Sequence, residues 1–262
     1  MPRSGSELLQ CILHQNPRIY GSPTSPLLEY IFAARQNFDL PEVKSQDSAL
    51  MQKAFFSMCS AMPEAYYKSI TDRPIICEKN RGHAHYFELW EQILQEKPKM
   101  ICMVRDLRSI IASFERIFRN NRHSPQGPDN PQQLLNMTVE QRVDYWLNTQ
   151  PVGLALLRTL DSFQRGISGN LCFVRYEDLC RDPDAIMADI YIYIDEPYFQ
   201  HDFQNIKKEV NEDDSHYGIF GNHSVKPELK PVEPNDWADV LPLEIAESIK
   251  SRYSWYFETF GY

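Results

Sequence analysis

The sequence predicts an α/β fold of three layers, with a central parallel sheet between two layers of helices. Three short runs are apolar without interruption, which is typical of strands covered on both faces. Helical patterns separate these runs, and such an alternation is typical of a parallel sheet. The runs are residues 75–77, 100–104 and 171–174. We expect one domain over residues 1–262.

Helices are expected between and after these strands. The spacing of apolar residues predicts helices over 86–95, 107–120 and 243–257, each with one apolar stripe. Asp182 and Pro183 are of the residue types that favour an N-cap and a first helical position, so a helix should run from there to about residue 193. Near the amino end, apolar residues of 8–13 share one face of a further helix.

The composition is that of a globular protein, with 42% apolar and 24% charged residues. The 27 basic and 36 acidic residues give a net charge of −9, which argues against nucleic acid or an anionic membrane as a partner. No apolar run reaches the roughly 18 residues of a membrane span. The start lacks the apolar core of a secretory signal, and none of the six cysteines forms a CxxC pair. We therefore expect a cytoplasmic protein with free thiols and no metal site.

Cationic side chains follow the predicted strands. Lys79 comes after the first strand, and Arg105 and Arg108 come after the second. Ligands of α/β sheets bind beyond the carboxyl ends of the strands, so these residues are candidates for one site. Cations at a helix start oppose the helix dipole at a cost of ~0.3–1 kcal/mol each, which indicates an anion beside them.

A short turn at the amino end is a second candidate for binding an anion. Arg3, Ser4, Gly5 and Ser6 form this turn, which leads directly into the first predicted helix. A glycine-containing turn before a helix offers free backbone N–H groups at the positive end of the helix dipole. Because the protein is acidic overall, such a local site would have to hold the anion.

Four motifs, in order along the chain, resemble those of the sulfotransferases that use 3′-phosphoadenosine 5′-phosphosulfate (PAPS). Residues 2–6 resemble the phosphosulfate loop of that family, and residues 104–108 with Ser113 resemble its 3′-phosphate loop and helix. Residues 174–179 resemble the family's Tyr-Glu-Asp-Leu signature, and Lys79 stands where the family has its catalytic lysine. Residues 218–221, with Lys226, weakly resemble the loop that closes over the nucleotide.

The resemblance implies a P-loop-like fold and transfer of a sulfuryl group from PAPS to a hydroxyl or amine, with adenosine 3′,5′-bisphosphate (PAP) as product and no metal. Lys79 would act at the bridging oxygen, where negative charge develops as the sulfuryl group leaves. The turn would hold the phosphosulfate, Arg105 and Ser113 the 3′-phosphate, and Tyr176 the adenosine. The implied nucleotide-binding residues are Arg3, Ser4, Gly5, Ser6, Arg105, Ser113, Tyr176 and Lys226.

The general base stays open among three residues. His83 and His85 follow Lys79 closely, and histidine is the usual base near neutral pH. Glu78 is adjacent to Lys79, and members of the family also use a glutamate. A histidine at a helix start is also often structural, and Tyr176 equally fits a position in the core.

Two departures from the family pattern fall on the amino-terminal turn. The family's loop follows a central strand, and no strand precedes the turn here, so we expect a gap in the sheet with unpaired backbone groups. A strand from a partner would fill such a gap. The second departure is Glu7, where the family usually has Thr or Ser. Two like charges ~4 Å apart repel by about 4 kcal/mol at an effective dielectric of 20.

Two other functions are compatible with parts of this pattern. The departures favour a catalytically impaired relative that binds a nucleotide or a partner. A P-loop kinase would need Gly-Lys-Ser/Thr in the turn and an acidic metal ligand after a strand, where this sequence has Arg105. The acceptor stays open among small alcohols, glycans, lipids and tyrosine peptides, although the acidic composition argues against heparan-like polyanions.

Overall fold

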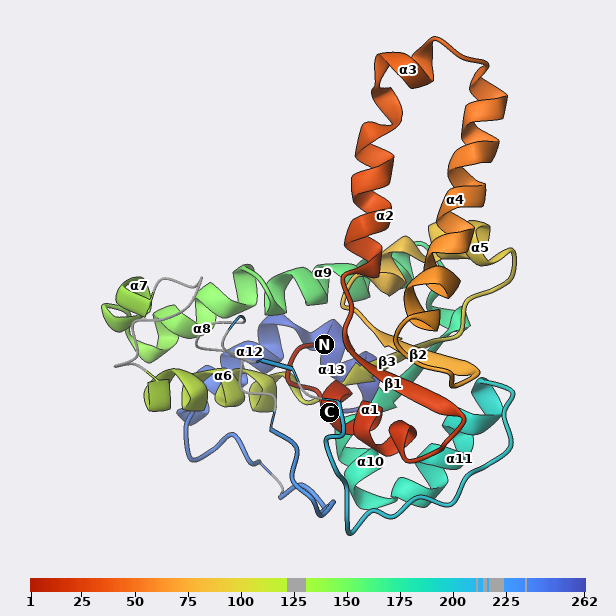
Figure 1. Cartoon of the computed structure of the whole chain (residues 1–262). Coiled ribbons are helices and arrows are strands. Elements are labelled where there is room, and N and C mark those ends of the chain that lie inside the picture. The colour runs from red at the N-terminus through yellow and green to blue at the C-terminus, as the bar shows by residue number, and fades with distance from the viewer. Residues whose placement is uncertain (122–130, 211, 214–215, 217–223, 234) are drawn as a thin grey trace.

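The computed structural model of the chain describes residues 1–121, 131–210, 212–213, 216, 224–233 and 235–262 (Figure 1). Its strands form two parallel pairs. β1 (Ile19–Thr24) pairs with β2 (Ile75–Lys79), and β3 (Met100–Val104) pairs with β4 (Leu171–Arg175). In the part of the chain that is described, no strand joins β2 to β3. The α/β class with parallel strands flanked by helices is confirmed, and the expected gap separates the two pairs.

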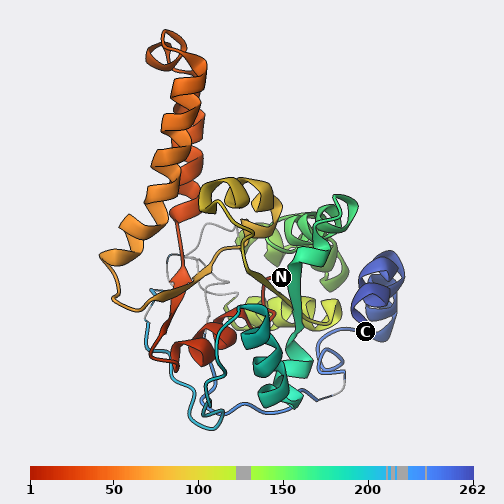
Figure 2. The same cartoon turned by 90° about the vertical axis from the view of Figure 1, so that its right-hand side faces the viewer.

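Helices cover both faces of the strands. The cluster on one face contains α1, α10 and α11, and the cluster on the other contains α2, α4 and α5 (Figure 2). The helices of the two faces are α1 (Ser6–His14), α10 (Tyr176–Arg181), α11 (Pro183–Tyr193), α2 (Leu27–Gln36), α4 (Ser48–Lys68) and α5 (Phe87–Leu94). This arrangement places α1 directly after the amino-terminal turn and beside β1.

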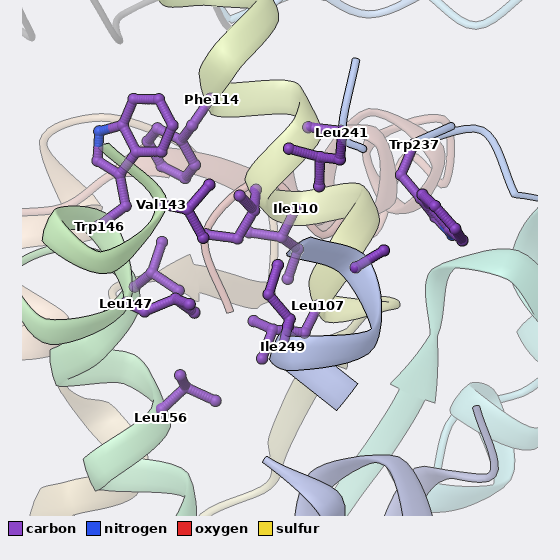
Figure 3. Packing of buried hydrophobic residues seen from close by; sticks show 14 of the residues in the cluster. Leu107, Ile110, Phe114, Val143, Trp146, Leu147, Leu156, Trp237, Leu241 and Ile249 are labelled. Carbon is purple, nitrogen blue, oxygen red and sulfur yellow. The ribbon is translucent and has the colours of Figure 1, made fainter. Parts of the chain in front are cut away.

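A third apolar cluster lies beside the strand layers and holds α6 in place (Figure 3). Phe114 of α6 and Trp146 of α8 pack together in it with ring centroids 5.9 Å apart, and both are fully buried. Further helices are α6 (Leu107–Asn121), α7 (Pro131–Leu135), α8 (Val139–Asn148), α9 (Val152–Gln164), α12 (Leu243–Arg252) and α13 (Ser254–Phe260). Because α6 begins just after β3, this packing fixes the orientation of its first turns.

Most predicted elements are present, and the exceptions have local causes. Asp182 caps α11 by accepting a hydrogen bond from the Ala185 N–H at 3.3 Å, as its sequence predicts. The single helix predicted over 243–257 is two helices, α12 and α13, which break at Tyr253. β1 was not predicted because Gly21 and Pro23 are typical of turns. Gly21 is required there because a Cβ would lie 2.5 Å from a carbonyl oxygen of α1.

The helices α2 and α4, with the short α3 (Pro41–Lys44) at their tip, form an arm that projects from the body (Figures 1 and 2). At the base of the arm, Leu28, Ile31 and Cys59 are buried. Toward its tip, Leu40 and Leu50 are about half exposed. No helix of the described residues is long and apolar enough to cross a membrane. All six cysteines are free thiols, as expected.

His201 provides a test of this packing through pH. The side chain is buried against Tyr191, with Nε2 3.1 Å from the tyrosine hydroxyl oxygen, and burial lowers the pKa of His201 to about 4 from 6.5. The unfolded chain therefore binds this proton at higher pH than the folded chain does. Its contribution to the free energy of unfolding is full above pH 6.5 and falls as the pH drops to 4, by roughly 2–3 kcal/mol.

We expect urea unfolding to show this loss between pH 7.5 and pH 4.5. The variant His201→Gln should be less stable at neutral pH and should lose less on acidification. An equal loss in both proteins would contradict the assignment to His201.

Candidate active site

The amino-terminal turn has a backbone that only certain residues can adopt. Arg3 and Gly5 have positive φ values of 55° and 84°. A Cβ on Gly5 would lie 2.4 Å from a ring carbon of Tyr176, so glycine is needed for both the conformation and the close approach. Ser4 is buried and donates a hydrogen bond to the Met1 carbonyl at 2.6 Å. The turn thus presents the N–H groups of the first turn of α1, which have no partner within the helix.

Three of the predicted phosphate-binding residues meet at this turn. Arg105, directly after β3, donates through Nη1 to the Arg3 carbonyl at 3.2 Å. Arg3 donates through Nε to the Ser113 hydroxyl of α6, also at 3.2 Å. The Arg105 guanidinium lies 4.7 Å from the centroid of the Tyr176 ring. Burial raises the pKa of Tyr176 to about 12, so its hydroxyl stays protonated in the physiological range.

A carboxylate lies beside Arg105, where the sequence predicts an anion. Asp236 lies with one oxygen 2.7 Å from Arg105 Nη2 and accepts a hydrogen bond from the Ser109 hydroxyl with the other. Arg105 Nε is buried and has no hydrogen-bond partner among the described residues. The anion that the sequence predicted near this arginine is therefore an internal carboxylate, and the guanidinium keeps one buried donor for a ligand.

Lys79 lies at the end of β2 within a cluster of four charges. Its Nζ contacts Glu7 of α1 and lies 3.4 Å from an oxygen of Glu212. Lys208 lies 3.5 Å from Glu7 and 3.9 Å from Glu212. The side chains of Lys79, Glu7 and Glu212 are at most 15% exposed, so their interactions are only weakly screened by solvent. The two lysines and two carboxylates sum to zero charge.

Glu7 therefore binds a cation of its own protein. The sequence predicted repulsion between Glu7 and a phosphosulfate, and the structure shows Glu7 in an ion pair with Lys79. Glu212 is fixed independently, because it accepts a hydrogen bond from the Thr24 N–H at 2.7 Å. The predicted catalytic lysine is thus held between two carboxylates.

Two of the candidate bases, His83 and Glu78, lie together. His83 Nε2 is 3.4 Å from Glu78 Oε1, without the geometry of a hydrogen bond, and the imidazole packs edge-on against Trp90. Both ring nitrogens of His83 are buried and have no hydrogen-bond partner among the described residues. His83, Glu78 and Lys79 all line one cavity of about 1010 Å³, which also reaches Ser6 of the turn. The nearby His85 is 3.2 Å from Asp161 and does not line this cavity.

Lys226 is not among the residues that line the cavity containing Lys79. Lys226 is exposed. The next residue, Pro227, accepts a backbone hydrogen bond from Ile206. Residues 218–221, which the sequence placed with Lys226 in a closing loop, lie outside the described residues. Arg108 pairs with Asp106 at 2.6 Å, so its compensating anion is its own neighbour.

Sequence reasoning missed four residues of the site. Glu212, Lys208 and Asp236 come from an irregular part of the chain, where no periodicity relates them to a strand or helix. Ser109 had a detectable signal: it precedes Ser113 by four residues and so shares its face of α6.

The fold is an α/β arrangement of parallel strands flanked by helices, and comparison with known proteins identifies the family. A model of the sulfotransferase family matches residues 1–200. A search of curated proteins gives no match. Two solved structures are similar in fold: the sulfotransferase domain from the curacin biosynthetic pathway and that from the Synechococcus PCC 7002 olefin synthase.

Each of these two structures is 19% identical to the chain. The curacin-pathway domain has a TM-score of 0.56 over 97% of this chain and 94% of its own. The olefin synthase domain has a TM-score of 0.52 over 95% and 91%. At this identity the likeness shows the fold alone, whereas the family match covers most of the sequence. The chain belongs to the sulfotransferase family.

Proposed function

We propose that this protein transfers a sulfuryl group from PAPS to a hydroxyl or amine acceptor and releases PAP. The observation that supports this most directly is the convergence of Arg3, Arg105 and Ser113 on the turn before α1. Three elements distant in sequence there supply donors for an anion. The buried free Nε of Arg105 fits a ligand with several acceptor oxygens, such as a phosphate.

The residues divide between the two ends of such a nucleotide. Arg105, with Ser113, would hold the 3′-phosphate, and the N–H groups of the turn would hold the 5′-phosphosulfate. Binding requires exchange, because Asp236 must leave Arg105 for the phosphate to take its place. Tyr176 supports the arginine by stacking beneath it and the turn by packing on Gly5.

PAPS supplies the sulfuryl group, and negative charge develops on the oxygen that it leaves. Lys79 Nζ is the cation we assign to that oxygen, because it stands at the end of β2 beside the first turn of α1. We assign the proton of the acceptor hydroxyl to His83, with Glu78 stabilising the imidazolium that results. Both His83 and Glu78 line the cavity that contains Lys79.

A nucleotide-binding relative without turnover is the second candidate. The observation that favours it is the position of Lys79 between Glu7 and Glu212. If both carboxylates remain when the nucleotide binds, the lysine cannot reach the reacting oxygen. Tight binding of PAP without release of PAP from PAPS, under a broad acceptor screen, would identify this candidate.

Calorimetric titration with PAP tests the nucleotide site. We expect micromolar binding by the unmodified protein and at least about 100-fold weaker binding by Arg105→Ala. Two hydrogen bonds from a guanidinium to phosphate are worth roughly 3 kcal/mol together. The matched control is Arg181→Ala, which removes an exposed arginine at the end of α10. Equal affinity of Arg105→Ala and the unmodified protein, both shown to be folded, would contradict the site.

A further inference from the structure

Arg105 lies at a junction of the chain that belongs to neither of the two elements beside it. β3 ends at Val104 and α6 begins at Leu107. Backbone N–H and C=O groups at such a junction must find partners elsewhere in the protein, because they are nearly always paired when they leave water. The rotamers open to a side chain depend on its φ and ψ, so whatever fixes this backbone also directs the guanidinium.

The hydroxyl of Tyr256 bonds to both backbone groups of Arg105. It donates a hydrogen bond to the Arg105 carbonyl at 2.9 Å and accepts one from the Arg105 N–H at 3.4 Å. Tyr256 belongs to α13, 151 residues farther along the chain. A tyrosine hydroxyl has one proton to donate and lone pairs to accept, so it can form both bonds at once.

Packing accounts for the ring of Tyr256 but not for its hydroxyl. The side chain is fully buried, and its ring lies 6.2 Å from that of Tyr262 and 4.8 Å from that of Phe260, between centroids. A phenylalanine would make the same ring contacts. Burial raises the pKa of Tyr256, so the hydroxyl keeps its proton near neutral pH. A buried hydroxyl needs a partner, and here that partner is the residue that we assign to the 3′-phosphate.

A second side chain holds the residue after Arg105. Glu177 of α10 accepts a hydrogen bond from the Asp106 N–H at 3.0 Å. Its other carboxylate oxygen accepts one from the Tyr262 hydroxyl at 2.8 Å. Two successive residues of the junction are therefore fixed by side chains from outside β3 and α6.

The guanidinium of Arg105 depends on a fixed backbone because it has to exchange one of its partners. Nη2 pairs with Asp236, Nη1 donates to the Arg3 carbonyl, and Nε has no partner among the described residues. Under the proposed function, Asp236 must leave before a phosphate takes its place. A backbone held by Tyr256 keeps the arginine at the site during this exchange.

We propose that Tyr256 is a positioning residue for the nucleotide: its hydroxyl fixes the backbone of Arg105 and so directs the guanidinium at the 3′-phosphate. This inference rests on the proposed function, which assigns Arg105 to that phosphate. Tyr256 acts through Arg105 and not on the ligand itself. The sulfotransferase family model matches residues 1–200, so Tyr256 lies outside the matched part of the chain.

The variant Tyr256→Phe tests this role, because it removes the hydroxyl, keeps the ring and changes no charge. A matched control lies at the other end of β3. The Tyr193 hydroxyl of α11 accepts a hydrogen bond from the Met100 N–H at 2.8 Å and donates one to the Asn170 carbonyl, also at 2.8 Å. Tyr193→Phe therefore removes a hydroxyl that binds backbone at the first residue of β3, away from Arg105.

Calorimetry with PAP is the first readout. We expect Tyr256→Phe to bind PAP about tenfold more weakly than the unmodified protein, and Tyr193→Phe to bind it within about twofold. In the Arg105→Ala background, Tyr256→Phe should have no further effect, because a residue that acts through Arg105 is not additive with it. At saturating PAPS, kcat of Tyr256→Phe should fall less than about threefold, since the 3′-phosphate does not react.

Hydrogen exchange of residues 104–108 without nucleotide is the second readout. We expect exchange at least about fivefold faster in Tyr256→Phe and unchanged exchange in Tyr193→Phe. Equal PAP affinity of Tyr256→Phe and the unmodified protein would overturn the inference. So would an equal loss in both tyrosine variants, or a full effect of Tyr256→Phe when residue 105 is alanine. An unmodified protein that does not bind PAP would contradict the proposed function instead, and unchanged exchange in Tyr256→Phe would then refute the positioning of Arg105 separately.

Discussion

Replacing Lys79 with alanine is expected to lower kcat for sulfuryl transfer by about 10²–10³-fold. The ammonium group of Lys79 lies at the end of β2. It contacts Glu7 and lies 3.4 Å from Glu212. Its removal takes away stabilisation of the charge that develops on the leaving oxygen. Release of PAP from PAPS, with the acceptor that a screen selects, measures the effect.

The interpretation of this variant needs a second substitution. Lys79→Ala leaves Glu7 and Glu212 with less compensation by cations, so binding of the anionic donor also weakens. The double variant Lys79→Ala, Glu7→Ser should recover PAP affinity and still lack turnover. Lys208→Ala is the matched control, since it removes the other lysine of the same cluster, and its kcat should fall less than tenfold. A kcat retained by Lys79→Ala would show that the lysine is structural.

Replacing Glu7 with serine is expected to increase the affinity for PAP by about 10–100-fold. A carboxylate in the first turn of α1 repels an anion at the turn, by up to about 4 kcal/mol at ~4 Å and an effective dielectric of 20. The ion pair with Lys79 reduces this repulsion, and each 1.4 kcal/mol that remains corresponds to a factor of ten in Kd. Calorimetry with PAP at two salt concentrations measures the change, which should shrink as salt rises.

The matched control for Glu7→Ser is Glu29→Ser. Glu29 is also an acidic residue in the first turn of a helix, but it is exposed on α2. Its replacement should leave PAP binding unchanged. If Glu7→Ser binds PAP no better than the unmodified protein, the main effect of Glu7 is to position Lys79 and not to repel the ligand.

The parts of the fold that the sequence predicts are those with a periodic or continuous apolar pattern. β3 is predicted to the residue because 100–104 is uninterrupted, and α6 begins at Leu107 as its stripe indicates. β1 and the α2–α4 arm lack such patterns. Gly21 and Pro23 interrupt β1, while α4 buries only Cys59 and Tyr67 among its 21 residues. Contacts with the rest of the protein, which a local pattern does not contain, determine these elements.

The residues of the site also divide into those that a local sequence pattern predicts and those that it does not. Arg105 was predicted because it follows a strand, Arg3 because it lies in the turn before a helix, and Ser113 because of the resemblance to the family's 3′-phosphate motif. Glu212 and Asp236, which bind the two key cations, come from irregular segments more than 100 residues away from Lys79 and Arg105. Charge balance at the predicted cations required anions, and only the three-dimensional structure shows which carboxylates supply them.

The carboxylates that pair with Arg105 and Lys79 also affect which anions can bind at these cations. Each cation is already paired with a carboxylate of the same chain. A small ion such as orthophosphate must therefore displace a carboxylate that is always present at high local concentration. An anion that reaches only one of the two cations gains little from that exchange. Under the proposed function, a ligand with an anionic group at each end would displace both carboxylates in one binding event. The internal carboxylates would then favour a nucleotide with two separated charges over simple phosphate and sulfate salts.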